Sequence, residues 1–121
     1  MADVVRQVIV ANLATPFPLG RLSAHIAHAS VAGILDQGEW LDNTFQLITE
    51  GDPDLRYWMQ ESFTKAVCKA WGREDMEDIA ARARASGIHV SVIEEEGYLT
   101  ALAIGPADPQ ALKQFKDLPL L

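Results

Sequence analysis

Two β-prone runs near the C-terminus are separated by only a few residues, and this spacing limits the folds open to the chain. Residues 88–92 (Ile-His-Val-Ser-Val) begin the first run, and residues 99–104 (Leu-Thr-Ala-Leu-Ala-Ile) form the second. The link from Glu96 to Leu99 is too short for a crossover helix, so the two strands must run antiparallel if they are neighbours in one sheet. The sequence therefore predicts a mixed sheet.

Two further strands are predicted from shorter signals. Residues 7–13 contain the β-branched run Val-Ile-Val-Ala, which is interrupted by turn-forming residues 15–18 (Thr-Pro-Phe-Pro), a pattern typical of a buried strand. Residues 63–70 alternate Lys and Val with smaller side chains, which indicates a strand ending at Trp71 and Gly72. Four strands are thus expected.

Helical spacing separates these strands. A helix is predicted from Gly20, because small and apolar residues recur at intervals of four, three and four. Its core face consists of Leu22, Ile26, Ala29 and Gly33. A second helix, ended by Gly87, presents Met76, Ile79, Ala80 and Ala83 to the core. Residues 38–62 are irregular, and one or two short helices are expected there. Asp108 and Pro109 predict the start of a last helix with an apolar edge at Leu112 and Phe115.

The element order β-α-(α)-β-α-β-β-α, without repeats, is that of an α/β protein. With 121 residues, 49% of them hydrophobic, the chain can form one core but is short for two domains, so we expect a single domain over residues 1–121. No run approaches the ~18 apolar residues that span a bilayer, and residues 1–4 lack a basic or apolar signal. We expect a cytoplasmic protein that does not contact membranes.

Charge argues against a nucleic-acid partner. Ten Lys and Arg residues against seventeen Asp and Glu residues give a net charge of -7, whose field repels phosphate, and no basic run is visible. Only a local basic patch would overcome this repulsion. The single cysteine, Cys68, lies in an apolar run and is expected to be a small buried residue, not a nucleophile.

Five short strings, in a fixed order along the chain, carry a family resemblance. Residues 20–29 read Gly-Arg-Leu-Ser-Ala-His-Ile-Ala-His-Ala, and residues 100–106 read Thr-Ala-Leu-Ala-Ile-Gly-Pro. The other three strings are residues 65–70, 86–88 and 117–121. In order and spacing they resemble the type 2 peptidyl-tRNA hydrolases of archaea and eukaryotes, whose first helix opens with Gly-Lys followed by Ala-Gln-x-x-His-Ala and whose terminal strand exits through Ile-Gly-Pro.

The resemblance implies a three-layer α/β/α domain with a four-stranded mixed sheet, often a homodimer, that cleaves the ester joining a peptide to tRNA. Several positions depart from the family pattern. Arg21 stands in place of its lysine, His25 in place of its glutamine, and Glu95 in place of the aspartate in its Asp-Ala-Gly turn. The family's Thr-x-Ile-x-Pro-Gly-Ser loop is absent after Gly97. The positions that match unchanged are His28 and Thr100.

Spacing places the candidate site on one face of the first helix. Arg21, His25 and His28 are separated by four and three residues, so their side chains share a face beside the apolar stripe. Ester hydrolysis needs a base, charge stabilisation and positioning groups. We expect His28 as the base, or His25 in its place, with Glu95 orienting it and Thr100 supplying a hydroxyl. We expect Arg21 and His25 to bind substrate; arginine, with a pKa above ~12, cannot lend a proton.

Other interpretations of the same residues stay open. The two histidines are equally explained as helix-surface or interface residues, and Arg21 as a cation paired with a carboxylate. No third ligand has the spacing for a metal, so neither metal nor cofactor is expected. Trp40, Trp58 and Trp71 could stack on bases, but two of them lie in apolar spacing that suits a core or a dimer contact, and core is the better explanation. The chain would then be a non-catalytic binding or regulatory domain, or a hydrolase of a small ester or amide acting through His28 and Glu95.

Overall fold

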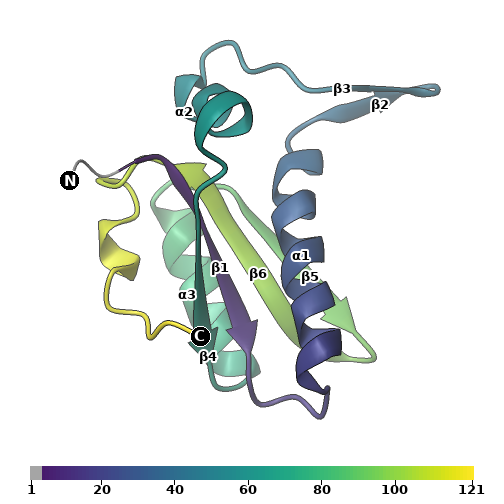
Figure 1. Cartoon of the computed structure of the whole chain (residues 1–121), viewed down its shortest axis with the longest axis vertical. Helices are drawn as coiled ribbons and strands as arrows, with labels where there is room; N and C mark the ends of the chain where they lie inside the picture. Colours follow the sequence, from purple (N-terminus) through teal and green to yellow (C-terminus); the bar gives the residue numbers. More distant parts are fainter. Residues whose placement is uncertain (1–3) are drawn as a thin grey trace.

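The computed structural model describes residues 4–121 and forms a mixed four-stranded sheet with helices on both faces. The sheet order is β4-β1-β6-β5, made of β1 (Arg6–Asn12), β4 (Lys65–Ala70), β5 (Val90–Glu95) and β6 (Tyr98–Ala107). Strand β1 is parallel to β4, whereas β6 is antiparallel to both β1 and β5. The predicted α/β class, the mixed sheet and the antiparallel last strand are confirmed (Figure 1).

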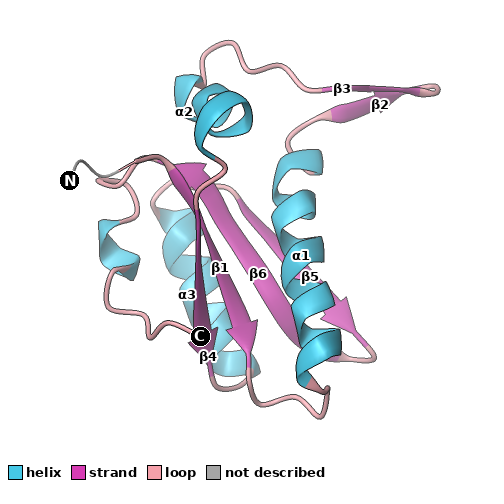
Figure 2. Ribbon diagram, in the orientation of Figure 1, coloured by secondary structure: helices cyan, strands magenta, loops and turns pink. Residues whose placement is uncertain are grey.

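Helix α1 (Leu19–Leu35) packs on one face of the sheet, and α3 (Arg73–Ala85) packs on the other (Figure 2). Alternate residues of β1 divide between the two layers, since Ile9 joins the α1 side and Val8 and Val10 join the α3 side. The predicted core face of α1 is buried at Leu22, Ala29 and Gly33. The helical spacing of apolar residues in the sequence therefore identified the two helices that form the outer layers.

Buried polar groups fix α1 against β1. Gln7 is fully buried, and its Nε2 donates to the carbonyl oxygen of Ser30 at 3.1 Å, while the Ser30 hydroxyl donates to Gln7 Oε1 at 2.6 Å. Gly33 leaves room for this pair, since an added Cβ would lie 2.7 Å from Gln7 Nε2. The register between helix and strand is thus set by hydrogen bonds as well as by packing.

Helix α3 ends as the sequence predicts. Gly87 has a φ of 75°, and its N–H donates to the carbonyl of Arg84 at 2.9 Å while the N–H of Ile88 donates to that of Ala83 at 3.1 Å. This pair of bonds satisfies the last helical carbonyls and turns the chain into β5.

Strand β6 extends beyond the run predicted over residues 99–104 and includes Gly105 and Pro106. Pairing resumes at Ala107, which lies opposite Arg6, because a register shift lets Gly105 and Pro106 bulge out opposite β1. Gly105 adopts a φ of 86°, which a side chain would disfavour. Because the bulged residues do not pair with β1, the missing N–H of proline breaks no strand-to-strand hydrogen bond, and the strand continues.

The last predicted helix is reduced to a short 3-10 turn, Lys113–Phe115. Asp108 does cap the segment, because its Oδ1 accepts from the N–H of Ala111 at 2.9 Å, and Leu112 and Phe115 are buried as expected. The helix does not propagate, since residues 117–121 extend along β4 instead. In this tail, the N–H of Lys69 donates to Pro119 O, and the N–H of Leu121 donates to Val67 O, each at 2.9 Å.

The irregular region contains one expected short helix, α2 (Pro53–Tyr57), followed by a π-turn at Trp58–Ser62. It also contains an unexpected β-hairpin, made of β2 (Glu39–Leu41) and β3 (Thr44–Gln46). The core assignment of the tryptophans is right for Trp58, which is 3% exposed, and wrong for Trp40 and Trp71, which are 67% and 63% exposed. Within the described part of the chain, no helix is long and apolar enough to cross a membrane.

Candidate active site

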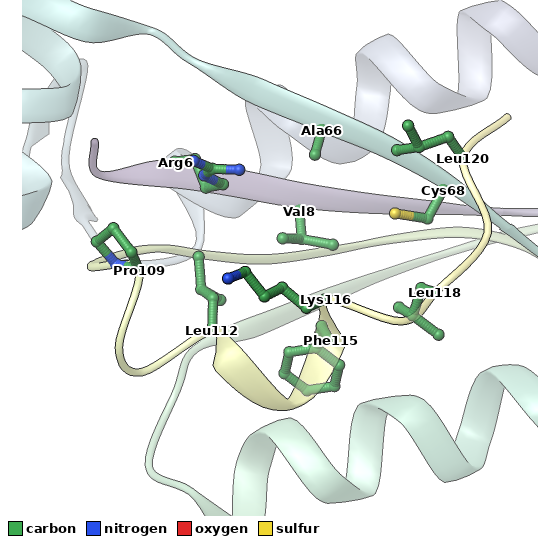
Figure 3. Close-up of a pocket in the computed structure, with 10 residues that line it drawn as sticks. All are labelled: Arg6, Val8, Ala66, Cys68, Pro109, Leu112, Phe115, Lys116, Leu118 and Leu120. Carbon is green, nitrogen blue, oxygen red and sulfur yellow. The ribbon is translucent and has the colours of Figure 1, made fainter. Parts of the chain in front are cut away.

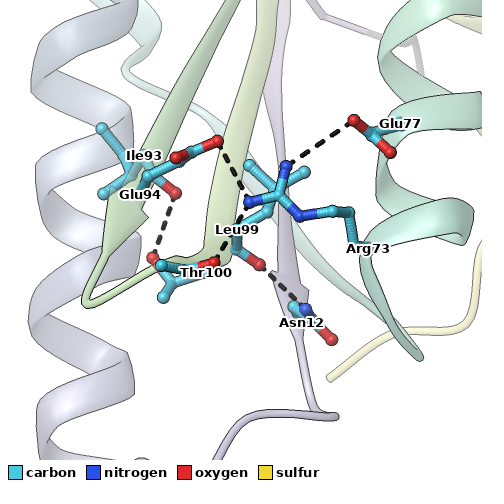
Figure 4. A network of polar contacts seen from close by, with 8 residues as sticks. Asn12, Arg73, Glu77, Ile93, Glu94, Leu99 and Thr100 are labelled. Atoms are coloured by element: carbon cyan, nitrogen blue, oxygen red, sulfur yellow. Dashed lines mark hydrogen bonds and ion pairs between the residues drawn. The ribbon is translucent and has the colours of Figure 1, made fainter.

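A buried asparagine at the end of β1 positions the segment that leads into α1. The side-chain N–H of Asn12 donates to the carbonyl of Leu99 at 2.8 Å (Figure 4). Its Oδ1 accepts from the N–H groups of Ala14 and Gly72, both at 2.9 Å. One side chain therefore joins the start of β6, the turn after β4 and the loop before α1, and this fixes where α1 begins.

The turn between β5 and β6 is a two-residue hairpin. Glu95 pairs with Tyr98, while Glu96 and Gly97 adopt φ values of 52° and 84°. Two consecutive positive φ angles are those of a type I′ turn, which suits the twist of antiparallel strands. The turn is consequently tight, and it holds the carboxylates of Glu95 and Glu96 near the first turn of α1.

Two arginines from opposite faces of the sheet hold this acidic turn. From α1, a terminal nitrogen (Nη2) of the Arg21 guanidinium lies 3.8 Å from Glu95 Oε1 and 3.5 Å from Glu96 Oε2. From α3, Arg73 contacts Glu94 at 3.1 Å and the carbonyl of Gly97 at 3.3 Å (Figure 4). These side chains are all about half exposed, so each pair contributes at most ~1 kcal/mol.

Aromatic rings extend the contact between α1 and the turn. The guanidinium carbon of Arg21 lies 4.3 Å from the centroid of the Phe17 ring, a cation–π geometry. Phe17 also meets His25 and Tyr98 edge to face, with centroid distances of 5.3 and 5.6 Å. Phe17 therefore connects the cation and the imidazole of α1 to the first residue of β6.

His25 is a buried imidazole with one unused nitrogen. The residue is 7% exposed, and Nδ1 has no hydrogen-bond partner within residues 4–121. An unpaired buried nitrogen is costly in a folded protein, so such a group is a candidate for ligand contact. His28, one turn further along α1, is exposed.

The sequence of the chain matches the Peptidyl-tRNA hydrolase PTH2 family model over residues 5–121. The chain belongs to this family. A curated peptidyl-tRNA hydrolase of Halobacterium salinarum is 32% identical over 110 residues, covering 85% of this chain and 87% of that protein. Those of Nanoarchaeum equitans and Methanopyrus kandleri are 29% and 28% identical, over 91% and 96% of this chain and 92% and 97% of theirs.

In this member of the type 2 peptidyl-tRNA hydrolase family, only some of the predicted site residues lie next to one another. Arg21 and Glu95 meet, as expected, and His25 joins them through Phe17. Within the described residues, no hydrogen bond or ion pair links His28 to Glu95. Thr100 is fully buried, and its hydroxyl donates to the carbonyl of Ile93 at 3.3 Å (Figure 4).

Sequence reasoning missed three residues of this site, namely Phe17, Tyr98 and Asn12. Phe17 stands between two prolines, and Asn12 is a polar residue at the end of a buried strand, so both carried local signals. Tyr98 follows the turn glycine directly. A nucleophilic role for Cys68 finds no support, because burial raises the pKa of its thiol.

Proposed function

We propose that this chain hydrolyses the ester bond between a peptide and tRNA in the cytoplasm, at the site between the start of α1 and the β5–β6 turn. The observation that carries the proposal is the family match over residues 5–121, combined with the position of Arg21 and His25 on the helix face that meets this turn. In the proposed complex, the Arg21 guanidinium binds a phosphate or the carbonyl oxygen of the ester.

Hydrolysis then needs one base on α1. The base takes a proton from water, the water oxygen attacks the ester carbonyl, and the proton returns to the departing ribose oxygen. The unpaired Nδ1 of His25 and its contact with Phe17 support His25 in this role. The exposure of His28 to water supports it as the alternative base. Glu95 would hold Arg21 in place, whereas Thr100, which is fully buried and donates its hydroxyl to the carbonyl of Ile93, would support the site only by fixing β6 to β5.

The distribution of charge removes part of the objection to a tRNA substrate. Residues 36–54 contain no Lys or Arg and six of the seventeen acidic residues: Asp36, Glu39, Asp42, Glu50, Asp52 and Asp54. The rest of the chain carries eleven acidic and ten basic residues. This acidic segment follows the C-terminal end of α1, the end opposite Arg21 (Figure 1). Much of the repulsion for phosphate therefore originates away from the site.

The test is release of labelled peptide from N-acetylated aminoacyl-tRNA at low salt, with a gel-shift assay for tRNA binding. Arg21→Ala should lower kcat/KM by about ten-fold or more, since it removes the cation of the site. Arg56→Ala, which removes an exposed cation of α2, is the matched control and should have no effect. His25→Ala and His28→Ala identify the base, because only the base variant should lose turnover while keeping tRNA affinity.

A non-catalytic binding domain is the second candidate, and one observation favours it. The Arg21 guanidinium, which is proposed to bind phosphate, faces two carboxylates that compete with it. Binding of tRNA without peptide release would support this candidate. If the protein neither binds tRNA nor releases peptide, the proposed function is wrong. Hydrolysis of a small ester without action on tRNA would instead favour a small-molecule hydrolase.

A further inference from the structure

A cavity of about 170 Å³ lies between the sheet and the C-terminal segment, on the face of the sheet that α3 covers (Figure 3). Strands β1 and β4 line it with Val8, Ala66 and Cys68. The segment after β6 lies across from them and contributes Leu112 and Phe115. The C-terminal segment therefore covers this part of the sheet without filling the space beneath it.

Most of the lining of this cavity is apolar and held in place by the core. Val8, Cys68, Leu112 and Phe115 are each only 3–4% exposed. The tail after Leu118 is attached to β4 by backbone hydrogen bonds, so the wall on that side is also fixed. Apolar cavities of ~150 Å³ take up a molecule the size of benzene. The space is thus preformed for a small apolar group.

Two cations line the same cavity. They are Arg6 of β1 and Lys116, which follows the 3-10 turn, and none of the lining residues is acidic. Figure 3 shows both charged ends on the side of Pro109, whereas Leu118 and Leu120 lie at the opposite end. The cavity therefore has a basic end and an apolar end.

This basic end departs from the charge of the chain as a whole. The sequence contains seventeen acidic residues against ten basic ones, so two cations without a carboxylate are unusual for its surface. Asp108, which precedes Pro109, does not line the cavity, and its Oδ1 accepts from the N–H of Ala111 at 2.9 Å. Within residues 4–121, Lys116 forms no ion pair. An anion in the cavity would supply the carboxylate that this end lacks.

We propose that the cavity binds a small carboxylic acid as its anion, with an apolar body of about six to eight carbons. The apolar body lies against Val8, Cys68 and Leu118, and the carboxylate points toward Arg6 and Lys116. A guanidinium has five N–H donors, so Arg6 can bind a carboxylate while it keeps other contacts. A single negative charge suits the site, because each further charge would have to leave water for an apolar cavity. The cavity lies across the sheet from α1, so this site does not depend on the proposed hydrolysis.

Titration calorimetry at low salt, with linear carboxylates from acetate to decanoate, tests the size of the site. Each added methylene should lower Kd by about four-fold up to octanoate, because each one buries further apolar surface. The gain should stop there, because the cavity is then full. An affinity that keeps rising through decanoate would indicate adsorption to the protein surface and would overturn the proposal. Absence of saturable binding of both hexanoate and octanoate would also overturn it.

The role of charge is tested with Lys116→Gln and with hexanamide, the neutral analogue of hexanoate. Lys116 is exposed, so its loss should weaken hexanoate binding by about three- to five-fold and leave hexanamide binding unchanged. Lys113→Gln is the matched control, because Lys113 is an exposed lysine of the same turn that does not line the cavity. If wild-type protein binds hexanamide as tightly as hexanoate, the assignment of a carboxylate is wrong.

Two further measurements locate the ligand. Ala66→Leu fills the cavity and should abolish binding, whereas Ala66→Ser, which keeps the size of the side chain, should retain it; circular dichroism verifies that both variants are folded. The thiol of Cys68, the single cysteine, points into the cavity (Figure 3). Hexanoate should therefore slow labelling of Cys68 by methyl methanethiosulfonate, and acetate should not. Hexanoate binding that neither protects Cys68 nor responds to Ala66→Leu would place the ligand elsewhere and overturn the proposal.

Discussion

The imidazole of His25 meets the phenyl ring of Phe17 edge to face, with ring centroids 5.3 Å apart and ring planes at 86°. The guanidinium carbon of Arg21 lies 4.3 Å from the centroid of the same phenyl ring, which also contacts the ring of Tyr98. Phe17 lies in a loop before α1, and its contacts are with one residue of the sheet and two of the helix. The relative position of cation and imidazole therefore depends on a loop residue that carries no reactive group.

Replacement of this ring should impair the site more than the fold. Phe17→Leu keeps apolar volume but removes the edge-to-face and cation–π contacts, each worth about 0.5–1.5 kcal/mol. We expect kcat/KM for peptidyl-tRNA to fall by roughly three- to ten-fold, with little change in Tm. Phe63→Leu, which changes an exposed ring beside Trp58, is the control. Equal loss in both variants would argue against the role given to Phe17.

Neutralising the acidic turn should strengthen tRNA binding. Glu96→Gln removes a carboxylate 3.5 Å from Arg21 and leaves Glu95, at 3.8 Å, to hold the guanidinium. Since exposed pairs contribute ~0–1 kcal/mol, we expect up to about a five-fold tighter Kd for tRNA at low salt, and a smaller gain at high salt. Glu77→Gln on α3 removes the same charge from a position beside Arg73 and provides the comparison. A weaker Kd in the Glu96→Gln variant would mean that Glu96 also positions Arg21 for binding.

The buried pair between β1 and α1 should be sensitive to truncation. Ser30→Ala leaves Gln7 Oε1 without its 2.6 Å donor inside the protein, and an unsatisfied buried acceptor costs about 1–3 kcal/mol. Urea unfolding should show this as a lower midpoint with an unchanged m-value. Ser23→Ala provides the matched control, because the Ser23 hydroxyl is exposed and bonds only to the carbonyl four residues earlier in α1. If the two variants unfold alike, the Gln7 pair does not contribute to stability.

Stability should decrease on mild acidification because of His89. Burial lowers the pKa of His89 below its ordinary value of 6.5; Asp36 opposes the shift and Arg84 adds to it. At a pH between the folded pKa and 6.5, His89 is therefore mostly protonated in the unfolded chain but mostly neutral in the folded protein. The contribution of neutral His89 to the free energy of unfolding is thus present above pH 6.5 and is lost as the pH falls through the folded pKa. The neutral ring is held by Ser91, whose hydroxyl lies 2.9 Å from His89 Nε2 and donates to Asp36 at 2.6 Å.

Urea midpoints measured above and below pH 6.5 test this dependence. His89→Asn retains a side-chain amide for Ser91 but removes the titrating ring, so its midpoint should fall less than that of the wild type as pH decreases. The two proteins share every titratable group except His89, so the difference between the two curves isolates the contribution of His89. Parallel curves would assign the acid sensitivity to another group.

The sheet and its two main helices were predictable because burial on one face imposes a period on the sequence. The helix from Gly20 carries that period over several residues, whereas the strand from residue 99 is marked by a nearly continuous apolar run, because both of its faces are buried. The β2–β3 hairpin was not predictable, since its three-residue strands contain no buried residue that would mark one face. The last helix was predicted to be longer than it is. Its cap at Asp108 is present and signals a helix start, but the segment that follows forms only a single turn.

The candidate site was predictable only where chain topology alone brings residues together. A hairpin between the last two strands places Glu95 beside α1, so the contact with Arg21 could be expected. The ring contacts of Phe17 depend on how a loop reverses direction, which no local period encodes. Spacing likewise placed His28 on the same helix as His25, but it did not reveal that only His25 would be buried.

The tail beside β4 bears on how copies of the chain avoid indiscriminate stacking. An outer strand with free N–H and C=O groups is a template for cross-β aggregation. In this protein, Pro119 and Leu121 occupy those groups at Val67 and Lys69, and Leu120 bridges to Cys68. The final residues thus act as a built-in shield for the β4 margin of the sheet, so cross-β stacking of copies cannot start from that margin.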